Sequence, residues 1–169
     1  MKIIILGAGQ VGRTLAENLA NDANDVTMVD QDAGYLKDLQ ERLDIRTVKG
    51  HACLPNILAS AGAEDADMLV AVTNSDEINM VACQIAKTMF QTPTIISRIR
   101  EHQYLLKRDA LFRDEPRAFP IDVIISPEKL VTAHVQRLIE NPTALQVLDF
   151  AKGKVQLVAV TACHGGPLV

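Results

Sequence analysis

Three glycines near the amino terminus of this chain have the spacing of a phosphate-binding turn. Gly7, Gly9 and Gly12 form the pattern GxGxxG, directly after an apolar run and directly before a segment of helical periodicity. In such a turn the first glycine permits a tight bend, the second lets a pyrophosphate approach the backbone, and the third lets helix and strand pack closely. The helix start offers free N–H groups and the positive end of its dipole to phosphates. The predicted nucleotide site therefore begins with Gly7, Ala8, Gly9, Gln10, Val11 and Gly12.

An acidic residue follows the glycines at the distance at which dinucleotide-binding domains hold a ribose. Asp30 ends a second apolar run and lies 18 residues after Gly12. We expect its carboxylate to accept hydrogen bonds from an adenosine ribose 2′-hydroxyl and to repel a 2′-phosphate, which disfavours NADP. NAD, ATP and ADP all contain a pyrophosphate and an adenosine ribose, so these residues leave the choice among them open. In the alternative reading, the glycines only form a tight turn and Asp30 caps the next helix.

Short apolar runs alternate with segments of helical periodicity through the first 125 residues. The runs predict strands at 3–6, 26–29, 46–49, 68–72, 94–99 and 123–125. One of the helices between them opens at Ser75 or Asp76, and its inward stripe is predicted to be Ile78, Val81, Ala82, Ile85, Ala86 and Met89. Because no hairpin signal interrupts the alternation, the predicted fold class is α/β, a doubly wound parallel sheet of the Rossmann type.

The predicted topology brings polar residues to the carboxyl edge of the sheet, where such folds bind their ligands. Besides the glycine turn and Asp30, this edge receives His51, the pair Thr73 and Asn74, and Arg98, each of which follows or ends a predicted strand. Each residue also has a purely structural reading. Thr73 and Asn74 suit loop and helix-cap chemistry, Arg98 suits a surface salt bridge, and a loop histidine such as His51 is often only solvated.

The composition excludes several classes of protein. The chain has 169 residues, a net charge of −4 and a pI of about 5.5, so a general nucleic-acid-binding surface is not expected. Its apolar runs are far shorter than the roughly 18 residues of a membrane span, and its first residues lack a signal-peptide pattern. Cys53, Cys83 and Cys163 are scattered and form no familiar zinc spacing. We therefore expect a cytoplasmic protein with free thiols and no metal site.

The chain changes character after the last strand of the predicted sheet. Residues 126–128, Ser-Pro-Glu, have the composition of a helix start, and the helix is expected to run to about Ile139 with a broad apolar surface. That surface suits packing against a second subunit, or alternatively against the last strand of its own sheet. Segments 144–151 and 155–161 then predict two strands outside the alternating pattern.

Several of these segments together resemble the RCK (or KTN) family, the cytosolic nucleotide-binding subunits of bacterial potassium uptake systems. The glycine motif alone is shared with many dehydrogenases, but its combination with the other segments is far more specific and covers nearly the whole chain. The segments are MKIIILGAGQVG at 1–12, Val29-Asp30, Gly50-His51, VAVTNSDEINMVAC at 70–83, Ser97-Arg98-Ile99 and ISPE at 125–128.

The resemblance implies a role for each part of the site. Gly7 to Val11 would hold the pyrophosphate, and Asp30 would hold the adenosine ribose. Thr73 and Asn74 would flank the adenine side, and Arg98 would reach toward a phosphate or the second nucleoside.

The resemblance also implies a division of the chain. Residues 1–125 would form the Rossmann nucleotide-binding domain, 126–141 the crossover and dimerisation helix, and 142–169 the start of an incomplete C-terminal domain.

The function implied by the resemblance is regulation rather than catalysis. The protein would bind NAD(H), or ATP or ADP at the same site, form a homodimer or tetramer, and control an integral-membrane potassium transporter from the cytoplasmic face of the inner membrane. The alternative is the cofactor domain of an NAD-dependent dehydrogenase, which needs a substrate pocket and a general acid or base. The four histidines are dispersed and no catalytic set is evident, so no catalytic residue is expected.

Overall fold

The structure, a computed structural model, describes most of the first 127 residues and parts of the remainder. The described residues are 1–20, 22, 24–112, 118–127, 131–132, 135–136, 139, 144–150 and 155–160. The chain divides into two units, Met1–Ile125 and Ser126–Val169, and each contains a sheet of its own. Within the described residues, no helix is both long enough and apolar enough to cross a bilayer.

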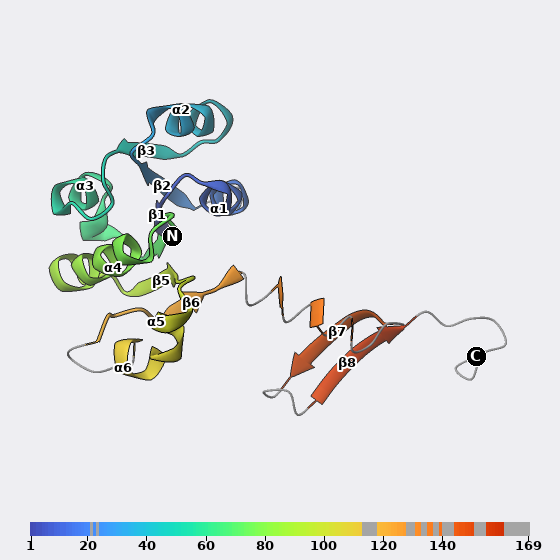
Figure 1. Ribbon diagram of the computed structural model, residues 1–169. Coiled ribbons are helices and arrows are strands. Elements are labelled where there is room, and N and C mark those ends of the chain that lie inside the picture. Colours follow the sequence, from blue (N-terminus) through green and yellow to red (C-terminus); the bar gives the residue numbers. More distant parts are fainter. Residues whose placement is uncertain are drawn as a thin grey trace. The chain divides into compact units, whose positions relative to one another are not determined.

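In the described part of the first unit, six strands form one parallel sheet (Figure 1). They are β1 (Lys2–Leu6), β2 (Asp25–Asp30), β3 (Arg46–Lys49), β4 (Met68–Ala71), β5 (Thr94–Arg98) and β6 (Val123–Ile125). Their order is β3-β2-β1-β4-β5-β6, and every neighbouring pair is parallel. This confirms the predicted doubly wound sheet, in which the strand order reverses between β1 and β4.

Helices cover both faces of this sheet. They are α1 (Gln10–Ala20), α2 (Ala33–Arg42), α3 (Pro55–Ser60), the 3₁₀ turn η1 (Ala63–Asp65), α4 (Asp76–Phe90), α5 (His102–Leu106) and α6 (Arg108–Phe112). Helices α1 and α2 lie on one side of the sheet, and α3 and α4 lie on the other (Figure 1). Helices α5 and α6 are separate and short because Lys107, which lies between them, leaves the helical conformation at φ −102° and ψ 23°.

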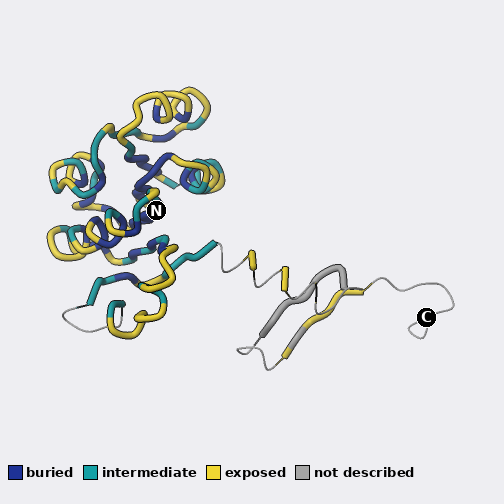
Figure 2. The backbone as a smooth tube through the Cα atoms, in the orientation of Figure 1, coloured by how far each residue is buried: buried dark blue, intermediate teal, exposed yellow. Residues whose placement is uncertain are grey.

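The side chains of β1 alternate between two cores. Ile3 and Ile5 pack with buried residues of α1 and α2, whereas Ile4 and Leu6 pack with buried residues of α3 and α4. Each of these four residues is buried, which is what a continuous apolar run in a parallel strand requires. Figure 2 shows the same pattern across the sheet, with buried strands inside and exposed outer faces on the helices. The central strand therefore fixes the position of the glycine turn that follows it.

Helix α4 buries part of the predicted stripe, since Ala82 and Ala86 are buried, but its buried face is turned away from two other predicted members. Val81 and Met89 were expected to point inward, but they are 43% and 58% exposed. Asn79, Met80 and Cys83 are buried instead. The apolar periodicity misplaced the stripe because a hydrogen-bonded asparagine occupies an inward position that apolar spacing alone does not identify. This asparagine lies next to the candidate site described below.

The described residues of the second unit include helical positions and two paired strands. The described residues between Pro127 and Ile139 are helical, and Val131, Val135 and Ile139 are exposed at four-residue spacing. The rest of the predicted crossover helix lies outside the described residues. Strands β7 (Ala144–Phe150) and β8 (Val155–Val160) pair antiparallel. The two predicted strands are confirmed, while their assignment to a C-terminal domain stays a prediction.

Candidate functional site

A cavity of about 340 Å³ opens at the carboxyl edge of the sheet, where the strand order reverses. It is lined by Gly7, Gly9, Gln10, Val11, Val29, Asp30, Gln31, Tyr35, Gly50, Ala52, Val72, Thr73, Asn74, Ile78 and Arg98. The sheet therefore brings together most of the residues predicted from sequence, although they are spread over more than 90 positions of the chain. Among the predicted residues, Ala8, Gly12 and His51 do not line the cavity.

The three glycines of the turn are required for different reasons. Gly7 has φ +105°, and a Cβ there would lie 2.9 Å from the Thr73 Cα. A Cβ on Gly12 would lie 1.8 Å from the Gly7 carbonyl oxygen. In contrast, a Cβ on Gly9 would meet no atom within 4 Å. The fold therefore needs Gly7 and Gly12, whereas Gly9 leaves open space at the cavity, which is what a closely approaching pyrophosphate needs.

Helix α1 begins at Gln10, immediately beside this open space. The first-turn N–H groups of a helix have no intrahelical acceptors, and they mark the positive end of the helix dipole. Gln10 and Val11 line the cavity in this first turn. The arrangement is therefore suited to an anion.

Asp30 connects the glycine turn to the loop after β2. Its Oδ2 accepts a hydrogen bond of 2.6 Å from the Ala8 N–H, and its Oδ1 accepts one of 2.8 Å from the Asp32 N–H. Ala8 thus contributes to the site through its main chain. Each carboxylate oxygen has two lone pairs, so Asp30 retains acceptor capacity for ribose hydroxyls while it holds both loops.

Two residues beside Asp30 form a stack that sequence reasoning missed. The guanidinium of Arg13 lies over the ring of Tyr35 at 4.2 Å from its centroid, a cation–π geometry. The Arg13 Nε–H donates to the Ala8 carbonyl at 2.8 Å, and Arg13 also lies 3.9 Å from an Asp38 oxygen. These partners hold Arg13 against the glycine turn. Tyr35 lines the cavity, and no motif in the sequence singled it out.

The opposite half of the rim is held by side chains from the first turns of α4. Asn79 hydrogen-bonds to both Thr73 and Arg98. Asp76 is buried, and its Oδ2 accepts from the main-chain N–H groups of Arg100 at 2.8 Å and Glu101 at 2.7 Å. These contacts join the loop after β4 to the loop after β5, so the two loops form one connected edge.

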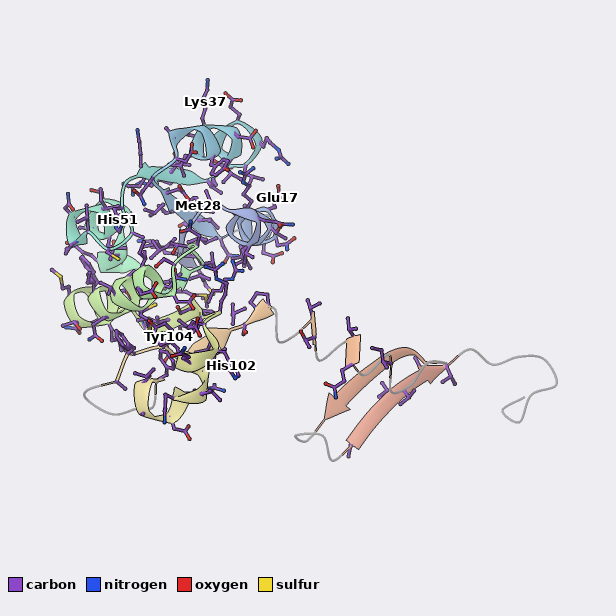
Figure 3. The ribbon with its side chains drawn as sticks, viewed as in Figure 1. Glu17, Met28, Lys37, His51, His102 and Tyr104 are labelled. Atoms are coloured by element: carbon purple, nitrogen blue, oxygen red, sulfur yellow. The ribbon has the colours of Figure 1, made fainter. Side chains whose placement is uncertain are left out.

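His51 takes a position beside the cavity rather than in it. Its Nδ1 accepts a hydrogen bond of 3.3 Å from the Cys53 N–H, and its side chain lies beside α3 (Figure 3). The residues before and after it, Gly50 and Ala52, line the cavity instead. A direct contact between His51 and a ligand therefore stays a prediction, and the small neighbouring residues are the ones that shape the wall.

Two described cysteines lie close to the site, and both are protonated groups at neutral pH. Burial raises the pKa of Cys83 to about 12, and burial also raises the pKa of Cys53.

At the edge of α4, the Ser75 hydroxyl donates to Glu77 at 2.7 Å and lowers the pKa of that carboxyl. The Tyr104 hydroxyl, labelled in Figure 3, donates to the same carboxylate at 3.2 Å, which raises the pKa of Tyr104.

Comparison with known proteins places this site in a family context. The sequence matches the family model of the TrkA-N domain over residues 3–127. The Trk system potassium uptake protein TrkA of Halomonas elongata is 63% identical over 169 residues, which are all of this chain and 36% of that protein. The corresponding protein of Vibrio alginolyticus is 59% identical over the same shares. The chain thus spans about a third of the length of these relatives.

Solved structures share the fold at low identity. The TrkA-N domain of the inner membrane protein ybaL from Escherichia coli has a TM-score of 0.70 and 18% identity, covering 82% of this chain and 96% of that one. The GsuK channel bound to NAD has a TM-score of 0.61 and 21% identity, over 79% of this chain and 22% of that one. GsuK bound to ADP has a TM-score of 0.59 and 21% identity, over 74% of this chain and 31% of that one.

The family model covers about three quarters of the chain, and every segment that carried the sequence resemblance falls inside it or at its boundary. The resemblance noted from the sequence is therefore confirmed. The chain belongs to the TrkA-N domain family.

Proposed function

We propose that this chain is the nucleotide-binding regulatory part of a potassium uptake system, and that it binds NAD(H), or ATP or ADP, in the cavity at the carboxyl edge of its sheet. The observation that carries the proposal is the contrast among the three glycines. Of these three, only Gly9 has open space where its side chain would be, and Gly9 lines the cavity together with the first turn of α1 and Asp30.

The proposed ligand lies across the switch point of the sheet. Its pyrophosphate meets the turn from Gly7 to Val11, and its adenosine ribose meets the Asp30 carboxylate. Thr73 and Asn74 flank the adenine side, and Arg98 meets a phosphate or the second nucleoside. Apart from Ala8, all of these residues line one cavity. The GsuK structures, one bound to NAD and one bound to ADP, support nucleotides of this class.

The proposed output of binding is regulation of a membrane partner. The relatives are named as potassium uptake proteins, which supports a partner that is an integral-membrane potassium transporter, with this chain at the cytoplasmic face. A nucleotide can shift an arrangement of subunits only by the difference between its affinities for the two arrangements. We propose that the chain acts as a homo-oligomer. The exposed Val131, Val135 and Ile139 support this because they present one apolar helix face. The chain is proposed to catalyse no reaction.

Calorimetric titration tests the nucleotide site directly. The wild-type chain and a Gly9→Val variant are titrated with NADH, NAD, NADP, ATP and ADP. We expect wild-type binding of the adenine nucleotides with NADP weakest, and a loss of about tenfold or more in the variant, about 1.4 kcal/mol. Since the valine meets no atom of the fold within 4 Å at its Cβ, the variant should unfold at the wild-type temperature. Absence of binding of all five compounds to the wild-type chain would refute the proposal.

A further inference from the structure

A fully buried asparagine joins the two loops that form the β4 and β5 side of the cavity. Asn79 lies on the inward face of α4 with 0% exposure and does not line the cavity. Its Oδ1 accepts a hydrogen bond of 3.0 Å from the Thr73 N–H and lies 2.7 Å from the Thr73 Oγ1. Its Nδ2 donates to the Arg98 carbonyl at 3.0 Å. Thr73 and Arg98 both line the cavity.

The hydrogen-bonding pattern fixes the orientation of the amide and the identity of the residue. The Thr73 N–H is only a donor and the Arg98 carbonyl is only an acceptor, so the amide oxygen must face Thr73 and the amide nitrogen must face Arg98. A rotation of the amide by 180° would place donor against donor and acceptor against acceptor. A side chain of this length that is both acceptor and donor is required, and asparagine supplies both while remaining neutral.

The sheet itself does not fix the relation between these two residues. The ladder between β4 and β5 ends with the pair Ala71 and Ser97, so Thr73 lies two residues beyond the last paired position of its strand. Beyond the end of this ladder, the hydrogen bonds of Asn79 join Thr73 to the Arg98 carbonyl. One turn of α4 earlier, Asp76 accepts from the N–H groups of Arg100 and Glu101. Helix α4 therefore holds the last residue of β5 and the segment after it at three main-chain groups.

We infer that Asn79 is a positioning residue of the nucleotide site. It touches no ligand, but it sets the distance between Thr73 and the main chain of Arg98, and thereby where the Arg98 side chain meets the phosphate or second nucleoside. The inference rests on the proposed nucleotide function. It adds that affinity depends on a buried amide outside the cavity.

An Asn79→Asp variant gives a readout that a merely structural role would not produce. The carboxylate keeps an acceptor for Thr73 but places a negative oxygen against the Arg98 carbonyl, whereas the protonated acid restores a donor. Burial raises the pKa of such a carboxyl, so the switch falls in an accessible range. We expect NADH affinity in the variant to be about tenfold or more below wild type near pH 8 and to recover toward wild type near pH 5.5.

A matched control carries the same chemical change at the other end of the sheet. The Asn24 Nδ2 donates to the Leu19 carbonyl at 3.0 Å in a part-buried position. Asn24→Asp should therefore leave NADH affinity at the wild-type value at both pH values. The wild-type chain, titrated in parallel, corrects for every other ionisable group.

A neutral variant separates positioning from simple charge repulsion. Asn79→Leu removes all four hydrogen bonds of the Asn79 amide without adding charge, so we expect it to weaken NADH binding at every pH. Hydrogen exchange of the Thr73 amide in the unliganded chain should be faster in Asn79→Leu, which removes the acceptor of that N–H. Wild-type affinity in Asn79→Leu, or a flat pH profile in Asn79→Asp, would overturn the inference. If Asn79→Leu does not fold, the pH profile decides. If the wild-type chain itself binds no NADH, the proposed function fails instead.

Discussion

The two halves of the cavity rim are held by different means. On the β1 and β2 side, the glycine turn is shaped by backbone geometry, and one carboxylate, Asp30, ties it to the next loop. On the β4 and β5 side, two buried side chains of α4, Asp76 and Asn79, hold the loops through their hydrogen bonds. The first half depends on the absence of side chains, and the second depends on their presence. Adding a side chain should therefore destabilise the first half, whereas altering an existing side chain should destabilise the second.

The largest effect is expected where the backbone is most crowded. In Gly12→Ala, the new Cβ would lie 1.8 Å from the Gly7 carbonyl oxygen, so the turn or the helix must move. We expect a loss of about 3 kcal/mol or more in the free energy of unfolding. Gly9→Ala, its matched partner in the same turn, should change that free energy by less than about 0.5 kcal/mol. Urea unfolding measures both, and equal losses would contradict the different roles assigned to the two glycines.

An intermediate effect is expected from the buried carboxylate in the other half. Asp76→Asn keeps the shape of the side chain but removes the negative charge of the group that accepts hydrogen bonds from the Arg100 and Glu101 N–H groups. We expect this change to lower the free energy of unfolding by about 2 kcal/mol. Asp32→Asn is the matched control, because Asp32 also accepts from two main-chain N–H groups but is exposed at the N-cap of α2. Asparagine is an equally good N-cap, so this control should be nearly neutral. Thermal unfolding measures both variants, and a lower unfolding temperature for Asp32→Asn than for Asp76→Asn would contradict this prediction.

The smallest effect is expected at the stack of Arg13 and Tyr35, where the first half of the rim does use side chains. Tyr35→Ala should lower the free energy of unfolding by only about 0.5–1 kcal/mol, because the stack is partly exposed. Tyr35→Phe keeps the ring and should match wild type. If urea unfolding shows the phenylalanine variant to be as unstable as the alanine variant, the hydroxyl rather than the ring would be the stabilising group.

The same contrast explains what could be predicted from the sequence. Glycine spacing, strand periodicity and the acid at the end of β2 report backbone geometry, and they predicted the parallel sheet, the turn and the place of Asp30 at the cavity. The burial of Asn79 on α4 could not be found in this way, because Asn79 is inward for its hydrogen bonds and not for its apolar character. Tyr35 reaches the cavity only through the way α2 packs beside α1, which no local pattern encodes.

His51 illustrates a different limit. Its place in the chain, directly after β3, correctly predicts that the segment reaches the cavity, since Gly50 and Ala52 line it. Chain position does not determine which way a loop side chain turns, and the hydrogen bond from the Cys53 N–H turns this one toward α3. A residue's place just after a strand therefore predicts that its loop reaches the cavity, but it does not predict which side chains of that loop line the cavity.

The carboxylate of Asp30 has a consequence for the kinetics of association. Because it already binds the Ala8 and Asp32 N–H groups, the glycine turn and the loop after β2 are ordered before any nucleotide arrives. A preorganised site spends little binding free energy on ordering its loops. The encounter with a nucleotide should then follow a single-step time course whose observed rate rises linearly with nucleotide concentration, without a slow closing phase.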